Sequence, residues 1–193
     1  MNRNKICKVI FGTLLLFISS HSYGQQDNLW ILSTQNSLLF NVGKVEVKTD
    51  YRFGPSDRAK SSICDSSGNL KLYTNGDSLY NSKNELIENG SNIGGHGRGN
   101  VKILEMPNSP NKYLIVCADV PMGGAAVKSR GLTYSIVEYS AKNPAGIVSK
   151  KMVPILPGKD IEFSIIKMTN DSVYWLAART LKSSFDSVYI FKI

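Results

Sequence analysis

A glycine-rich stretch, Gly94-Gly95-His96-Gly97-Arg98-Gly99, brings together the side chains that are best suited to ligand binding. Its backbone N–H groups, an imidazole and a guanidinium could meet an anion or a sugar, so His96 and Arg98 are the candidate ligand-binding residues. The stretch lacks the Gly-Lys-Ser/Thr ending of a phosphate loop and the spacing of a dinucleotide-binding loop. The alternative interpretation is a connection between two sheets, because glycines usually serve backbone geometry.

Outside the glycine-rich stretch, the sequence offers few residues in a pattern that indicates catalysis. His96 is the only histidine after residue 24, so a two-histidine zinc site is excluded from that part of the chain. A serine triad would need His96 as its base, and no Gly-x-Ser-x-Gly nucleophile motif accompanies it. We therefore expect no catalytic residue, no metal site and no cofactor.

Carboxylates offer an alternative, enzymatic interpretation. Two of them about 5–9 Å apart could hydrolyse a glycosidic bond. Single carboxylates at turns more often cap the backbone. The candidates are spread over several loops and strand ends: Asp65, Asp77, Asp119, Asp160 and Glu162.

Two cysteines, Cys64 and Cys117, follow residue 24 and stand in successive strand-like segments. An oxidising compartment would permit a disulfide between them. The alternative, which we favour, is that each is a small buried apolar residue.

Residues 1–24 resemble a secretory signal peptide. Arg3, Lys5 and Lys8 precede an apolar stretch, Val9–Ile18, and Ser22-Tyr23-Gly24 supplies small residues for cleavage. The apolar stretch is shorter than the ~20 residues that span a bilayer. We therefore expect residues 25–193 to be extracytoplasmic, in the periplasm, on the cell surface or secreted, without a membrane span.

The formal net charge of the whole chain is +8. The basic residues are scattered, and the longest cluster after residue 24 is Lys150-Lys151. Nucleic-acid binding would call for a dense basic patch, so we expect no nucleic-acid partner.

Alternation of apolar and polar residues with period two, bounded by Gly, Asn, Asp and Pro, predicts an all-β fold. The same unit of three strands occurs three times. The predicted strands are Ser61–Cys64, Asn69–Thr74 and Ser78–Tyr80; Asn100–Leu104, Lys112–Val116 and Leu132–Val137; and Ile161–Ile166, Ser172–Leu176 and Ser187–Phe191.

Further strands complete some of these units. A fourth strand is predicted at Glu85–Glu88 in the first unit and at Gly146–Val153 in the second. Leu29–Leu32 and Lys44–Val47 predict one or two strands of an earlier unit.

Four antiparallel strands in a repeat of about 40–50 residues are typical of β-propeller blades. We expect one domain at 25–193, a partial β-propeller of roughly three four-stranded blades. The third unit predicts an open sheet edge at Tyr189–Ile193, where self-association can occur.

The ordered set of turns and strands also carries a resemblance. The chain resembles the N-terminal propeller region of large secreted Bacteroidetes proteins, which often end in a gliding-motility or type IX secretion sorting domain. That resemblance implies further blades and a sorting domain, and neither is recognised in these residues, so the domain is expected to be incomplete. The matching residues are Asn28–Trp30, Cys64–Gly76, Asn81, Glu88–Gly90, Gly131–Val137 and Val173–Leu176.

We therefore expect a secreted, non-catalytic, propeller-type module that binds protein or glycan at the cell envelope. Two alternatives stay open: a propeller hydrolase or lyase with carboxylates along its channel, and a truncated remnant of a longer secreted protein.

Overall fold

The fold is all-β, as the alternation of apolar residues predicts. The structure is a computed structural model, which describes residues 28–31, 36–41, 43–49, 59–94, 100–119, 129–158, 160–167, 173–180 and 187–193. No helix occurs in these residues. Their strands are β1 (Leu29–Ile31), β2 (Ser37–Asn41), β3 (Lys44–Lys48), β4 (Ser61–Cys64), β5 (Leu70–Thr74), β6 (Leu79–Asn81), β7 (Val101–Glu105), β8 (Lys112–Asp119), β9 (Gly131–Glu138), β10 (Ile147–Leu156), β11 (Ile161–Lys167), β12 (Tyr174–Thr180) and β13 (Val188–Lys192).

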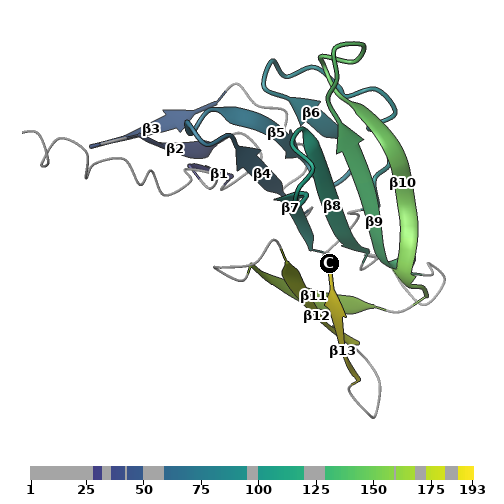
Figure 1. Cartoon of the computed structure of the whole chain (residues 1–193). Coiled ribbons are helices and arrows are strands. Elements are labelled where there is room, and N and C mark those ends of the chain that lie inside the picture. The colour runs from purple at the N-terminus through teal and green to yellow at the C-terminus, as the bar shows by residue number, and fades with distance from the viewer. Residues whose placement is uncertain are drawn as a thin grey trace, which may run out of the picture.

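The strands form four small antiparallel sheets, each built from consecutive strands (Figure 1). In order along the chain they are β1-β2-β3, β4-β5-β6, β7-β8-β9-β10 and β11-β12-β13. Neighbouring sheets contact each other through β1 and β4, β4 and β7, and β8 and β11. This order of consecutive sheets is the one expected for blades. A closed ring is not seen in the described residues.

The four-stranded sheet β7–β10 is the middle layer between two hydrophobic clusters. Ile103, Ile115 and Cys117 on one face pack in a cluster with Leu72 and other residues of the β4–β6 sheet. On the other face, Leu104, Leu114 and Val116 belong to a second cluster that includes Phe163 and Leu176 of the β11–β13 sheet. Because both faces are covered, β8 is buried from Tyr113 to Asp119 and shows no alternation in burial.

The last sheet has only one covered face. In β11, Ile161 and Phe163 are buried, whereas Glu162 and Ser164 are exposed, as the sequence predicts. The same alternation runs along β12, where Tyr174, Leu176 and Ala178 are buried.

The turns of the β4–β6 sheet follow the sequence closely. The Asp65 carboxylate accepts backbone hydrogen bonds from Ser67 and Asn69, both at 2.9 Å, and Gly68 has a φ of 82°. A tight hairpin connects β5 to β6. Asn75 N–H donates to Ser78 C=O at 3.3 Å, which leaves Gly76 and Asp77 at the tip.

Two predictions about strands need correction. Glu85–Glu88 is not a ladder strand, because only isolated bridges join Leu86 to Tyr80 and Glu88 to Ile147. Positive φ angles at Asn84 (62°) and Asn89 (59°) bend the backbone on both sides of this segment and keep it short. The described residues before Ser61 hold three strands rather than one or two, since β2 lies between the two predicted segments.

Candidate functional site

The two candidate ligand-binding residues, His96 and Arg98, lie outside the described residues. The segment that leads into their loop does pack against the β7–β10 sheet. Gly94 has a φ of 95°, and a side chain at this position would lie 3.5 Å from Thr133 Oγ1 of β9. Residues 1–24, the expected signal peptide, also lie outside the described residues.

Cys64 and Cys117 are not joined in a disulfide. Both are buried, as the apolar interpretation expects. Cys117 lies within β8, where burial and the nearby Asp119 raise the pKa of its thiol to about 12. A buried thiol with this pKa is neutral near pH 7 and is not a nucleophile.

The described carboxylates make separate local interactions. Asp65 caps its turn, Asp77 accepts a hydrogen bond from Ser78 Oγ at 3.2 Å, and Glu162 pairs with Arg179 at 2.8 Å. Asp119 is buried at the end of β8, and its Oδ1 has no hydrogen-bond partner among the described residues. Within the same residues, no three His, Cys, Asp or Glu side chains approach closely enough to hold a metal ion.

A cleft of about 590 Å³ lies between the β7–β10 and β11–β13 sheets. One side of the cleft consists mainly of apolar side chains from the middle sheet, among them Leu114, Ile136 and Ile155. The other side is formed by the start of β12 and the end of β13. Residues of both sheets line it: Leu104, Glu105, Met106, Pro107, Leu114, Tyr134, Ile136, Lys150, Ile155, Tyr174, Leu176, Phe191, Lys192 and Ile193.

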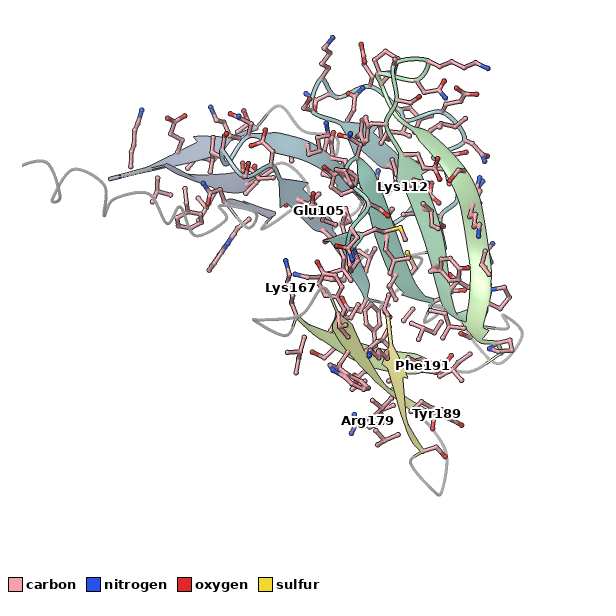
Figure 2. All side chains as sticks on the ribbon, in the orientation of Figure 1. Glu105, Lys112, Lys167, Arg179, Tyr189 and Phe191 are labelled. Atoms are coloured by element: carbon pink, nitrogen blue, oxygen red, sulfur yellow. The ribbon has the colours of Figure 1, made fainter. Side chains whose placement is uncertain are left out.

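The cleft exists because neighbouring sheets differ in their number of strands. Among the described residues, the middle sheet has four strands and the β11–β13 sheet has three, so no fourth strand lies opposite the outer part of the middle sheet. Tyr134 and Ile155 are therefore only partly buried, as are Tyr189 and Phe191 of β13. Figure 2 shows Tyr189 and Phe191 along β13, below the four-stranded sheet.

Few charged groups border the cleft. Glu105, Lys150 and Lys192 are the charged side chains in its lining. Burial, with a smaller contribution from Glu105, raises the pKa of the Tyr174 hydroxyl, so this phenol stays protonated at neutral pH and can donate a hydrogen bond. The lining thus combines a mostly apolar surface with two lysines and one glutamate.

The strand β13, which supplies part of the wall, is an edge strand. Ile193 N–H donates to Tyr174 C=O at 2.9 Å, and Tyr174 N–H donates to Ile193 C=O at 3.0 Å. In an antiparallel ladder every second residue bonds to the same neighbour, so the backbone groups of Val188, Ile190 and Lys192 point away from β12. Among the described residues no strand pairs with this edge, which is the edge predicted at Tyr189–Ile193.

Sequence reasoning identified the edge but not the cleft beside it. The cleft residues lie on six different strands, in the turn after β7 and directly after β13, and they form no local motif in the sequence. The one available signal was the difference in strand number between the second and third units, which leaves an apolar face without a cover.

No family model matches the chain, and comparisons with curated proteins and with solved structures also find no match. In the residues that the structure describes, no helix is long and apolar enough to cross a membrane.

Proposed function

We propose that this chain is a non-catalytic binding module outside the cytoplasm that holds an extended segment of a protein partner. The observation that carries the proposal is the apolar cleft of about 590 Å³ beside the open edge of β13. An extended segment can add to such an edge through main-chain hydrogen bonds while every second side chain enters an adjacent pocket. The signal-peptide pattern of residues 1–24 supports the location.

Of the two ligand classes expected from the sequence, the cleft favours protein over glycan. A sugar presents many hydroxyl groups, which need polar partners when they lose water. Leu104, Leu114, Ile136, Ile155 and Phe191 offer none through their side chains. Alternating apolar side chains of an extended peptide match this surface, and a carboxylate on the peptide would suit Lys150.

The test is a titration of the isotope-labelled chain with a blocked peptide, Glu-Val-Thr-Val-Thr-Val-Glu. We expect saturable binding and slower hydrogen exchange at the amides of Val188, Ile190 and Lys192, because these groups point to the open edge. Ile155→Glu, which places a charge in the cleft, should abolish binding. Ile166→Glu is the matched control, since Ile166 lies on the opposite face of the β11–β13 sheet, and it should bind normally.

A second peptide with proline in place of the central valine should bind weakly, because proline lacks an N–H donor and interrupts the hydrogen-bond ladder between the peptide and β13. Binding of soluble oligosaccharides without any effect of the peptide would contradict the proposal. Turnover of glycosidase, esterase or lyase substrates would favour the enzymatic alternative instead.

A further inference from the structure

The exposed large apolar side chains of the described residues gather on two faces at opposite ends of the series of sheets. Of eight such side chains, only Leu86 lies elsewhere. The others are Trp30, Val45 and Val47 on the first sheet, and Ile166, Trp175, Val188 and Ile190 on the last. Single exposed apolar residues are ordinary, but contiguous groups mark interaction surfaces.

Strand register shows that the residues of the first sheet share one face. Trp30 lies opposite Leu38, and Leu38 lies opposite Val47. Phe40 lies opposite Val45, and its ring centroid is 5.0 Å from that of Trp30. We call this surface the first-sheet face. The opposite side of the sheet holds Leu29, which is buried and accepts a hydrogen bond from Ser62 Oγ of β4 through its C=O at 2.7 Å.

The same reasoning defines the last-sheet face. Ile166 lies opposite Trp175, Ala177 opposite Ile190, and Arg179 opposite Val188. Val188 and Ile190 are 64% and 67% exposed. The other side of this sheet, with Phe163 and Leu176, packs against the middle sheet.

Repetition makes these two faces complementary. The β7–β10 sheet packs one face on the sheet before it and its other face on the sheet after it, and the β11–β13 sheet packs one face on the sheet before it. The first and second sheets contact each other through β1 and β4. The last-sheet face therefore corresponds to a surface that elsewhere receives the next sheet, and the first-sheet face corresponds to a surface that elsewhere packs on the preceding one. Repeat architectures bury their apolar faces by stacking neighbours in this manner.

We infer that a second copy of this chain docks head to tail, with the last-sheet face of one copy covering the first-sheet face of the other. The charges are compatible with this contact. The ion pair of Glu162 and Arg179 is internal to the last-sheet face, and the five residues that define the first-sheet face are uncharged. Lys192 therefore meets no like charge among them.

The small area of the first-sheet and last-sheet faces favours a closed ring of two copies of the chain. Three strands of about five residues cover roughly 15 Å by 17 Å. One such contact is smaller than the ~800 Å² per partner that stable complexes bury, whereas a ring of two copies forms the contact twice. Two copies also place eight sheets in succession, within the range of four to eight blades found in propellers.

Sedimentation velocity of the full chain over a range of concentrations tests the inference. The wild type should form a discrete dimer. Val45→Glu/Val47→Glu, on the first-sheet face, and Val188→Glu/Ile190→Glu, on the last-sheet face, should each be monomeric. Leu86→Glu removes an exposed apolar side chain outside both faces and should dimerise like the wild type.

Mixing the two double variants distinguishes a head-to-tail contact from a symmetric one. Each variant keeps one intact face, so the mixture should form a dimer with one contact, at a much higher concentration than the wild type needs, because one of the two contacts is lost. Dimerisation of either variant alone would overturn the inference, as would a wild type that is monomeric throughout or a mixture that associates no more than each variant does alone. If circular dichroism shows that a glutamate variant is unfolded, Val47→Ser and Ile190→Ser replace the two double variants.

Discussion

Burial controls the chemistry of Cys117. Its thiol lies within β8, inside the cluster that joins the second and third sheets, where a thiolate would have neither water nor a cation. Burial and Asp119 raise its pKa from 9.0 to about 12. Tyr113, in the same cluster, has its pKa raised from 10.0 to about 12, first by burial and then by Glu105 and Asp65.

These shifts predict a loss of stability at alkaline pH. The unfolded chain releases the Cys117 proton above pH 9 while the folded chain keeps it up to about pH 12. Stability should thus be fully present below pH 9 and decline as pH rises toward 12, by about 2 kcal/mol at pH 10.5 from this thiol. Cys117→Ala should lose less stability than the wild type between pH 8 and 10.5.

Urea unfolding at the two pH values measures this difference. Val116→Ala is the control, because it removes core volume next to Cys117 without removing a titrating group. An equal pH dependence in the wild type and Cys117→Ala would show that the thiol titrates alike in the folded and unfolded states.

At the level of single residues, local chemistry could be predicted and distant contacts could not. The turn at Asp65 depends on residues within four positions of each other, so the capping role of its carboxylate could be predicted from the sequence. The surroundings of Ile155 in the cleft depend on Phe191 and other residues far along the chain. Neither the spacing nor the composition of residues indicates which distant segments of the chain will come together around Ile155. The predicted roles of His96 and Arg98 stay predictions.

At the level of elements, β8 is covered on both faces whereas β11 is covered on one, and this difference leads to a second prediction. Leu114 and Ile115 are adjacent in β8 but belong to different clusters. Leu114→Ala and Ile115→Ala should therefore both lower the free energy of unfolding, by about 2–5 kcal/mol each. In β11, Ile166→Ala should change it by less than about 0.5 kcal/mol, because Ile166 is 63% exposed.

Chemical denaturation at low protein concentration, where the proposed dimer is dissociated, checks these three variants. A neutral Ile115→Ala would show that the β4–β6 sheet does not cover this face. A strongly destabilised Ile166→Ala would show that the outer face of β11 is buried within a single chain.

Strand prediction was reliable for the three repeated units and less so for the segments outside them. The alternation of β11 and β12 identified their buried residues directly. The strand β2 was missed, although Ser37–Asn41 is followed by Gly43 and Lys44, a spacing that fits a hairpin. Glu85–Glu88 was predicted as the fourth strand of its unit, but the left-handed backbone at Asn84 and Asn89 limits it to isolated bridges.

At the level of the whole molecule, the four sheets differ in how much of their surface is covered. The β7–β10 sheet is covered on both faces by the two clusters. The first and last sheets each keep an exposed apolar face. In a linear series of sheets, stability is shared mainly between neighbours, so the ends open more readily than the middle.

Native-state hydrogen exchange at low protein concentration should therefore show the slowest amides in β8 and β9 and faster exchange in β1–β3 and β13. Leu72→Ala, in the cluster between the second and third sheets, should speed exchange in β4–β6 more than in β11–β13, because the last sheet packs in the other cluster. Equal acceleration in all four sheets would instead indicate one cooperative unit. Raising the protein concentration should slow exchange in the first and last sheets together if the two end faces cover each other in a dimer, and protection of only one of them would contradict the head-to-tail contact.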